Sequence, residues 1–448
     1  MSAPAHPRFG TDGVRGVAIE EITPEYALAL GRAIGRVLSP SRLVIGRDPR
    51  ESGPALQTAL ASGVAAQGVD VDDVAVVPTP AIAALAARDG VPGVVITASH
   101  NPYTDNGIKV FAAGGRKVDD ATQQAIEVEL ASILAAEPSG SIPRRVGTVV
   151  PRAEALSWYV DHVVSLFAER CLAGARVVLD TANGAMYEAA PRVFRALGAD
   201  VIVLNDAPDG TNINRECGAT APRQLCDFVR QMGGVDFAFA FDGDGDRVIA
   251  VDDRGQVVDG DRLIALSALE RREQGRLAGS VVVATVMANL GFHRAMEAAG
   301  IQVVTTPVGD RHVLDAMDDG GFVLGGEQSG HIIHRDMGTT GDGLVAAVFV
   351  SVLARRRARS LSELASAVMT TYPQVLRNVR VGRRPADAAA EMRDEITAEE
   401  RRLGSEGRVL VRSSGTEPLV RVMAEAASHD EAQAVVDRLC AVAAERFA

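Results

Sequence analysis

The sequence predicts an α/β protein with three similar α/β domains, whose sheets are mixed and mainly parallel, and a smaller C-terminal α+β domain, arranged around a central cleft. Three observations predict this class. The length of 448 residues corresponds to three or four domains at about 150 residues each. A strand–helix–strand pattern returns three times, and after residue 377 the order of elements changes. Strands that alternate with helices are typical of parallel sheets.

The repeated unit consists of a short β-rich run, a turn, a helix and a second β-rich run. Its strand pairs are expected at 42–45 and 74–77, at 176–179 and 201–204, and at 281–284 and 303–305. In each copy a further short helix leads to a third β-rich run, at 94–97, 237–241 and 322–324. Ligands of open α/β sheets bind beyond the carboxyl ends of strands. The loops after these third strands are therefore the expected active-site segments.

The C-terminal part has a different order of elements. A strand is expected at 378–381, a long polar helix at 385–402, strands at 408–412 and 419–426, and an amphipathic helix from residue 430 onward. This order is typical of a small α+β domain. The four domains are expected at 1–150, 151–252, 253–370 and 371–448.

Composition limits the function classes. The formal net charge of −12 argues against a nucleic-acid partner. No stretch approaches 18 uninterrupted apolar residues, and the first residues lack a basic start followed by an apolar run, so we expect no membrane association and a cytoplasmic location. The cysteines form no C-x-x-C pair, which predicts reduced thiols.

Lysine is rare in this sequence. Only Lys109 and Lys117 are lysines among the 46 basic residues. Because a desolvated amine can lose its proton and a guanidinium cannot, a retained lysine indicates proton transfer. Chance retention on a surface loop is the alternative, and it fits Lys117 better than Lys109.

The first expected active-site loop is Thr97-Ala98-Ser99-His100-Asn101-Pro102. A hydrolase triad is disfavoured because the G-x-S-x-G turn is absent and adjacent residues on an extended backbone point to opposite sides. Ser99 is either a carrier of a phosphoryl group, which needs cations around it, or a structural serine.

The second loop, Asp242-Gly243-Asp244-Gly245-Asp246-Arg247, has the strongest chemical character. Carboxylates at alternate positions fall on one side of an extended segment, and their repulsion requires a hard cation. An EF-hand is disfavoured because Arg247 and Asp253 stand where that loop has Gly and Glu. Mg²⁺ fits better, because it commonly keeps sites for phosphate oxygens. A solvated acidic turn is the alternative.

Two further loops carry polar groups of lower specificity. Residues 325–331 (GGEQSGH) offer groups that bind sugar hydroxyls, although a simple glycine-rich turn is equally consistent. Residues 412–418 (RSSGTEP), with Arg421 nearby, combine cations, hydroxyls and backbone N–H groups, which suits a phosphate. A routine hairpin connection is the alternative for the second loop.

Together these motifs resemble the α-D-phosphohexomutase superfamily over essentially the whole chain. The matching segments are FGTDGVRG at 9–16, TASHNPYTDNGIKVF at 97–111, GGEQSGH at 325–331 and RSSGTEPLVRVMAE at 412–425. The residues of these segments resemble those of the subfamily that interconverts glucosamine 6-phosphate and glucosamine 1-phosphate, a step toward UDP-N-acetylglucosamine and peptidoglycan. The resemblance implies a cytoplasmic isomerase that works through phosphoserine and glucosamine 1,6-bisphosphate. A sugar 1,6-bisphosphate would be its activator.

The resemblance also implies a role for each matching residue. One Mg²⁺ per active site would be held by Ser99, through its phosphate, and by Asp242, Asp244 and Asp246. The groups around the reacting oxygen would be Arg15, His100, Lys109 and His331, with the choice of general base among the last three left open. Arg247 would neutralise the transferring group, Glu327 and Ser329 would hold the sugar hydroxyls, and the non-reacting phosphate would be held by Arg412, Ser414, Gly415, Thr416 and Arg421.

Other functions use the same loops. A phosphoglucomutase or phosphomannomutase would share all four loops. A magnesium-dependent sugar phosphatase would release inorganic phosphate, and a sugar-phosphate sensor would bind its ligand without turnover. Relatives are commonly dimers, so the resemblance implies a homodimer. Ser99 would be phosphorylated first by an activating kinase, by autophosphorylation or by a bisphosphate.

Overall fold

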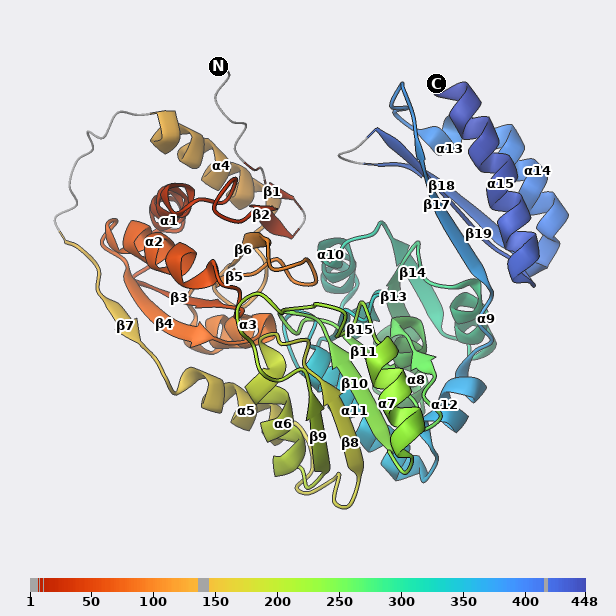
Figure 1. The fold of residues 1–448 in the computed structure, drawn as a ribbon, viewed down its shortest axis with the longest axis horizontal. Helices are drawn as coiled ribbons and strands as arrows, with labels where there is room; N and C mark the ends of the chain where they lie inside the picture. Colours follow the sequence, from red (N-terminus) through yellow and green to blue (C-terminus); the bar gives the residue numbers. More distant parts are fainter. Residues whose placement is uncertain (1–6, 8, 11, 136–144, 415–417) are drawn as a thin grey trace. The chain divides into compact units, whose positions relative to one another are not determined.

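The computed structural model describes residues 7, 9–10, 12–135, 145–414 and 418–448. The chain divides into two compact units, one of residues 1–287 and 301–366 and the other of residues 288–300 and 367–448. Four sheets form the framework, three in the first unit and one in the second (Figure 1). Among the described residues, no helix has the length and apolar character needed to cross a membrane.

The first sheet has the strand order β1-β2-β6-β5-β3-β4-β7. Strands β5, β3, β4 and β7 are parallel neighbours, and β6, β2 and β1 extend the sheet in antiparallel fashion. Its strands are β1 (Phe9–Gly10), β2 (Gly13–Val17), β3 (Arg42–Arg47), β4 (Asp70–Val76), β5 (Gly93–Ile96), β6 (Asp105–Phe111) and β7 (Val149–Pro151). Its helices are α1 (Pro24–Leu38), α2 (Gly53–Ala65), α3 (Thr79–Asp89) and α4 (Asp120–Ala135).

The second and third sheets have the orders β12-β11-β10-β8-β9 and β14-β13-β15-β16. The second contains β8 (Arg176–Asp180), β9 (Asp200–Leu204), β10 (Phe237–Phe241), β11 (Val248–Val251) and β12 (Val257–Val258), with α5 (Ala155–Ser165), α6 (Met186–Ala196) and α7 (Arg223–Met232). The third contains β13 (Val281–Thr285), β14 (Gln302–Thr306), β15 (Leu324–Gly326) and β16 (Ile332–His334), with α8 (Gly260–Glu273), α10 (Asp310–Gly320), α11 (Gly343–Arg357) and α12 (Leu361–Val368).

All three sheets share one plan. The first strand of each repeat lies between the second and the third, and the three are parallel. A fourth strand, β6, β11 or β16, then pairs with the third in antiparallel fashion. The expected active-site loop is thus the connection between a parallel strand and an antiparallel one. The predicted mixed, mainly parallel sheets are confirmed, whereas the antiparallel fourth strands were not anticipated.

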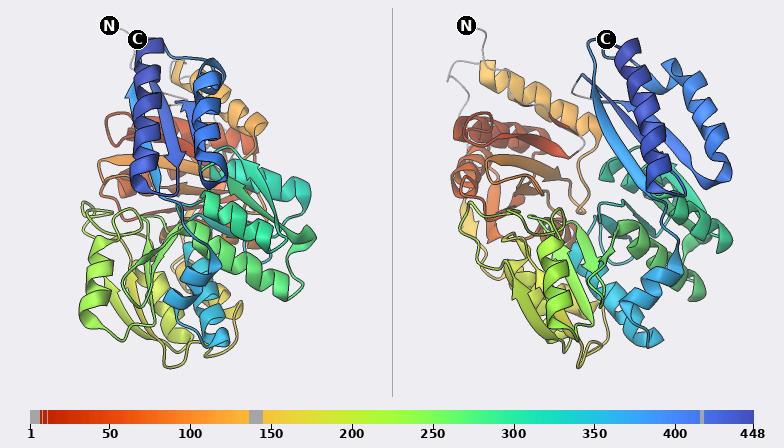
Figure 2. Two further views of the ribbon diagram at one scale, coloured as in Figure 1. Left: turned by 90° about the vertical axis from the view of Figure 1, so that its right-hand side faces the viewer. Right: turned by 45° about the vertical axis from the view of Figure 1, so that its right-hand side comes forward.

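The second unit contains the antiparallel sheet β17-β19-β18, formed by β17 (Gln374–Arg380), β18 (Arg408–Ser413) and β19 (Leu419–Glu425). Helices α13 (Ala388–Glu391), α14 (Arg393–Leu403) and α15 (His429–Arg446) lie on one face of it (Figure 2). Helix α9 (Leu290–Ala298) also belongs to this unit, because the Glu425 carboxylate accepts a hydrogen bond from the Leu290 N–H at 2.8 Å. The predicted C-terminal α+β domain is confirmed.

Several predicted element boundaries are wrong. The helix expected at 385–402 is interrupted at Met392, whose φ of −111° and ψ of 19° are not helical. Strand β4 begins at Asp70, four residues before the predicted start. The acidic residues at its start did not indicate a strand in the sequence. Two of them form ion pairs with arginines, Asp70 with Arg145 at 2.6 Å and Asp72 with Arg152 at 2.9 Å.

Helices α1 and α2 pack through two glycines that face the partner's backbone. A Cβ atom at Gly63 would lie 2.2 Å from the Leu28 carbonyl oxygen, and one at Gly31 would lie 2.2 Å from the Leu60 carbonyl oxygen. Because backbone atoms cannot move aside as a flexible side chain can, neither position accepts a larger residue without a shift of a helix.

We expect Gly63→Ala to lower the free energy of unfolding by about 1–3 kcal/mol, as overpacking of a filled core does. Ser62→Ala is the matched control, because Ser62 is the exposed neighbour in the same helix, and its effect should stay within about 0.5 kcal/mol. Urea unfolding of both variants measures the difference. Equal midpoints would contradict the close helix contact.

Candidate active site

The loop after β5 holds Ser99 in an unusual backbone conformation. Its φ is +53°, in the left-handed region, which costs a non-glycine residue about 1–2 kcal/mol. Its N–H donates to Thr97 Oγ1 at 2.8 Å, and its carbonyl oxygen accepts from Arg50 Nη2 at 2.8 Å and from Asn214 Nδ2 at 2.9 Å. The side chain is 1% exposed. The surrounding structure therefore compensates the strain and fixes the position of the hydroxyl.

A buried ion pair organises this loop. Arg50 is fully buried, and its Nε lies 2.9 Å from Asp48 Oδ2. The same guanidinium donates to the carbonyl oxygens of Asn101 and Asp105, at 2.9 and 3.0 Å, and to that of Pro102. The sequence pattern predicts only a turn for this segment. Two opposite charges two residues apart at the end of a buried strand were the signal that could have identified it.

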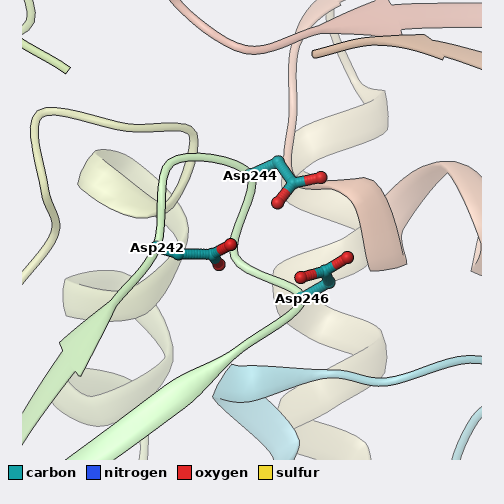
Figure 3. Close-up of side chains that lie close together, drawn as sticks. All are labelled: Asp242, Asp244 and Asp246. Atoms are coloured by element: carbon teal, nitrogen blue, oxygen red, sulfur yellow. The ribbon is translucent and has the colours of Figure 1, made fainter. Parts of the chain in front are cut away.

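The loop between β10 and β11 brings three carboxylates together (Figure 3). Asp242, Asp244 and Asp246 are buried, and each offers an oxygen within 4.8 Å of the others. Burial, and then the charges of Asp246 and Asp244, raise the pKa of Asp242 well above its usual value. Asp244 Oδ1 and Asp246 Oδ1 are buried without a hydrogen-bond partner. Three converging carboxylates with two unpartnered oxygens fit a hard divalent cation.

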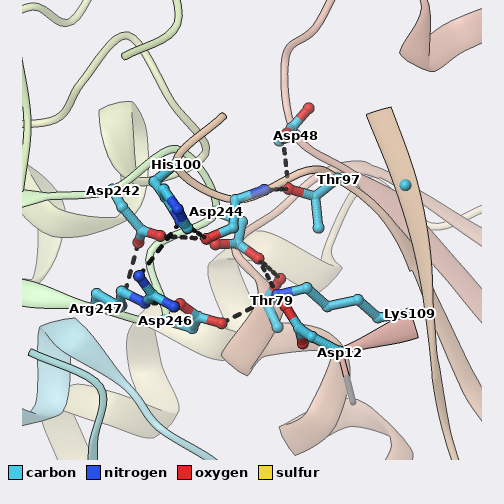
Figure 4. Close-up of polar contacts among 12 residues, drawn as sticks. Asp12, Asp48, Thr79, Thr97, His100, Lys109, Asp242, Asp244, Asp246 and Arg247 are labelled. Carbon is cyan, nitrogen blue, oxygen red and sulfur yellow. Dashed lines mark hydrogen bonds and ion pairs between the residues drawn. The ribbon is translucent and has the colours of Figure 1, made fainter. Parts of the chain in front are cut away.

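Ser99 lies against this cluster, and Figure 4 shows the polar contacts of the neighbouring Asp242, His100 and Arg247. Its hydroxyl donates to Asp242 Oδ2 at 2.6 Å and lies 3.3 Å from His100 Nδ1. Gly243 permits the close approach, since a Cβ atom there would lie 2.5 Å from the Ser99 carbonyl oxygen. Two loops more than 140 residues apart in the sequence thus place a hydroxyl beside the clustered carboxylate oxygens.

Lys109, in β6, supplies the positive charge nearest to the carboxylates. Its Nζ lies 2.8 Å from Asp244 Oδ2, 3.1 Å from Asp246 Oδ2 and 3.3 Å from Asp12 Oδ2, and the side chain is 1% exposed. Burial alone would lower its pKa, but Asp12 and then the two cluster aspartates outweigh burial and raise the pKa well above the usual value. Lys109 is therefore a cation here. Asp12 was missed as a site residue, although it lies within the motif at 9–16.

Two histidines flank the cluster with opposite charge preferences. Burial, then Arg247 and Arg15, lower the pKa of His100 to about 4, so it is neutral at pH 7. Its Nδ1 lies 3.3 Å from Arg247 Nη1. For His331, burial lowers the pKa, but its contact with Asp246, at 3.7 Å from Nδ1, leaves the net pKa raised. The imidazole of His100 is thus a proton acceptor, and that of His331 favours the protonated form.

Beside these groups is a cavity of about 410 Å³, lined by Gly10, Asp12, Gly13, Arg15, Asp246, Arg247, Val308, Gly309, Asp310, Glu327 and His331. Glu327 is 8% exposed, and one carboxylate oxygen accepts from the Gly309 N–H at 3.1 Å. Ser329, in the same loop, is exposed and does not line this cavity. The volume and the polar lining suit a sugar phosphate.

The expected phosphate loop is in the second unit. Arg412 and Arg421 are directly opposite each other on β18 and β19. Burial, and then the charge of Arg421, lower the pKa of Arg412, and no ion pair among the described residues includes either arginine. The Ser414 N–H donates to the Leu419 carbonyl oxygen at 2.9 Å. Gly415 and Thr416 lie outside the described residues. Two adjacent cations without a carboxylate partner favour an anionic ligand.

Comparison with known proteins agrees with this arrangement. Models of the phosphoglucomutase/phosphomannomutase family match in order: α/β/α domain I at residues 6–137, domain II at 157–255, domain III at 259–372 and the C-terminal domain at 376–442. The chain belongs to the phosphoglucomutase/phosphomannomutase family. The order of the four family domains agrees with the order of the four sheets.

Similar proteins cover almost the whole chain. A phosphoglucosamine mutase from Moorella thermoacetica is 48% identical over 97% of this chain and 98% of its own length. One from Frankia alni is 49% identical over 97% of each. A crystal structure of a phosphoglucomutase/phosphomannomutase family protein from Burkholderia thailandensis has a TM-score of 0.80, with 26% identity and 97% coverage of both chains.

The carboxylate cluster predicts how a cation affects stability. MgCl₂ at 100 times its dissociation constant should raise the free energy of unfolding by about 2.7 kcal/mol. In Asp242→Asn this gain should largely disappear, while without Mg²⁺ the variant should stay within about 1 kcal/mol of the wild type, because one repelling charge and one hydrogen bond are lost together. Thermal unfolding with and without MgCl₂ measures both. An undiminished gain in the variant would contradict the proposed ligand set.

Proposed function

We propose that this protein interconverts glucosamine 6-phosphate and glucosamine 1-phosphate, with Ser99 as the phosphoryl carrier. The observation that carries the proposal is the Ser99 hydroxyl, 2.6 Å from Asp242 in the buried cluster, with Lys109 paired with the other two carboxylates, Asp244 and Asp246. The names of the relatives at 48–49% identity support the amino sugar as substrate.

In the first half of the reaction, the phosphoryl group moves from Ser99 to the free oxygen of the sugar phosphate. The bond between Ser99 Oγ and phosphorus breaks as the bond from the sugar oxygen forms, and a base accepts the proton of the sugar hydroxyl. Lys109, His100 and His331 are the candidates for exchanging this proton, and of the three His100 is the one whose pKa, lowered to about 4, leaves it neutral. Arg247 and Arg15 neutralise the charge of the transferring group, as phosphoryl transfer requires.

The product of this step is glucosamine 1,6-bisphosphate, which turns within the site and returns its other phosphoryl group to Ser99. Glu327 and Ser329 hold the sugar hydroxyls in both orientations. Arg412 and Arg421, with Ser414, Gly415 and Thr416, hold the phosphate that is not reacting. Holding the substrate in place removes much of the entropic barrier to transfer.

Mg²⁺, one ion per site, would be held by Asp242, Asp244 and Asp246 together with the phosphate on Ser99. When bound, it supplies charge neutralisation at the transferring phosphoryl group. The unpartnered oxygens of Asp244 and Asp246 support this assignment.

The remaining features of the proposal follow the same chemistry. The four functional domains are 1–150, 151–252, 253–370 and 371–448. A sugar 1,6-bisphosphate activates the enzyme by phosphorylating Ser99, and a kinase or autophosphorylation are the other sources of the first phosphoryl group. The enzyme is a cytoplasmic homodimer that acts on a small amino sugar phosphate.

The decisive assay is phosphorus NMR of protein primed with glucose 1,6-bisphosphate and MgCl₂ and given equal amounts of glucosamine 6-phosphate and glucose 6-phosphate. We expect glucosamine 1-phosphate to form much faster than glucose 1-phosphate. Faster glucose 1-phosphate would indicate a hexose phosphate mutase, and release of inorganic phosphate alone would indicate a phosphatase.

Ser99→Ala should reduce isomerisation by at least ~10³-fold, because it removes the nucleophile, and should leave the unfolding midpoint near that of the wild type. Ser62→Ala, which removes an exposed hydroxyl outside the site, should keep full activity. Retained isomerisation in the Ser99 variant would rule out the phosphoserine route.

A further inference from the structure

Lys117 is largely enclosed by carboxylates, contrary to the expectation that it lies on a surface loop by chance retention. It follows β6, and its backbone bridges back to Phe111. The side chain is only 11% exposed and forms ion pairs with Asp12 and Asp310. Burial alone would lower the pKa of Lys117, but these two carboxylates raise it. Both lysines of the chain thus contact the same carboxylate, that of Asp12.

The two oxygens of Asp12 have different partners. Oδ2 is shared by Arg15 and Lys109, and Oδ1 is paired with Lys117. Lys117 therefore prevents Asp12 from rotating away from the two cations that the reaction uses. The carboxylate of Asp12, although partly buried, has a pKa well below its usual value because Lys109, Lys117 and Arg15 outweigh the effect of burial.

Asp310 connects Lys117 to the opposite side of the site. It is the first residue of α10, in the third sheet's part of the unit, and its Oδ2 is paired with Lys117 and lies 3.8 Å from His331 Nε2. That Nε2 is buried without a hydrogen-bond partner. A small movement of the Asp310 carboxylate would therefore change the environment of His331.

Lys117 approaches these carboxylates from behind the site. A second cavity, of about 350 Å³, is lined by Lys117, Asp310 and His331. The cavity beside the cluster is lined by Asp12, Asp310 and His331 but not by Lys117. Lys117 thus contacts carboxylates that line the cavity beside the cluster, but does not itself line the space in which the sugar phosphate would bind.

We propose that Lys117 is a positioning residue for phosphoryl transfer, which holds Asp12 and Asp310 so that Arg15, Lys109 and His331 face the reacting oxygen. A compact ammonium can lie between two carboxylates in this narrow space, whereas a planar guanidinium is a larger fork with fixed directions. This accounts for a lysine in a chain that otherwise uses arginine. The inference rests on the proposed function, because it assigns Arg15, Lys109 and His331 to the reaction.

The test compares Lys117→Met with a neighbouring variant, Arg116→Met. Arg116 comes from the same loop, but among the described residues its ion pair is with Asp318 near the other end of α10, at 2.6 Å, and not with Asp12 or Asp310. We expect Lys117→Met to lower kcat by at least tenfold with KM changed less than threefold. Arg116→Met should keep kcat within twofold, although it too removes an ion pair between the loop and α10.

A double variant separates positioning from stability. Lys117→Met leaves Asp310 without its cation, and the added change Asp310→Asn removes that charge, so the double variant should recover the unfolding midpoint but not kcat. If kcat recovers together with the midpoint, or if Arg116→Met is as impaired as Lys117→Met, the proposal is wrong.

Measurements with two substrates separate a failure of the Lys117 proposal from a failure of the proposed function. Rates are measured with glucosamine 6-phosphate and with glucose 6-phosphate, and the fold-loss in Lys117→Met should be the same for both, since Lys117 does not contact the sugar. If the wild-type protein converts only glucose 6-phosphate, the proposed substrate is wrong. The kcat of Lys117→Met on glucose 6-phosphate would then still test the positioning role. A Lys117→Met variant with wild-type kcat on the accepted substrate would overturn the positioning role alone.

Discussion

Repulsion among three buried carboxylates is the constraint on which the rest of the site depends. Asp242, Asp244 and Asp246 lie within 4.8 Å of one another away from water, where like charges interact strongly. Such a cluster is stable only if cations surround it or if one member takes up a proton. The raised pKa of Asp242 and the close contacts of Lys109 show both responses. A divalent cation would satisfy the remaining unpartnered oxygens.

The charges around the cluster alternate in layers. Lys109 pairs with Asp244 and Asp246, and Arg247 lies 3.8 Å from Asp246. Lys109 is also paired with a further carboxylate, that of Asp12, which Arg15 and Lys117 contact as well. Each layer reduces the desolvation cost of the previous one, because a buried charge is tolerated only when it is paired. The overall acidity of the chain is therefore compatible with a local site for phosphate.

The sheets place this chemistry. In each of the three related sheets, the functional loop joins a parallel third strand to an antiparallel fourth strand. Such a loop begins and ends in hydrogen-bonded strands, so its backbone is fixed at both sides. That rigidity explains how Ser99 is kept at a positive φ and how its hydroxyl stays within reach of a loop from the next sheet.

The sequence by itself determined the class of fold, the position of each functional loop and the chemical character of the groups in it, because these depend on local patterns: alternating strands and helices, spaced carboxylates, and a serine beside a histidine. It did not determine which groups meet. The contacts that form the site join distant positions: Lys117 lies 105 positions from Asp12 and 193 from Asp310, and Ser99 lies 143 positions from Asp242. Asp12, Asp48, Arg50 and Asp310 were overlooked for the same reason, since each is an ordinary charged residue of a turn or helix start. Only the tertiary structure decided their partners, because pairing of charges is a property of distance in space and not of order along the chain.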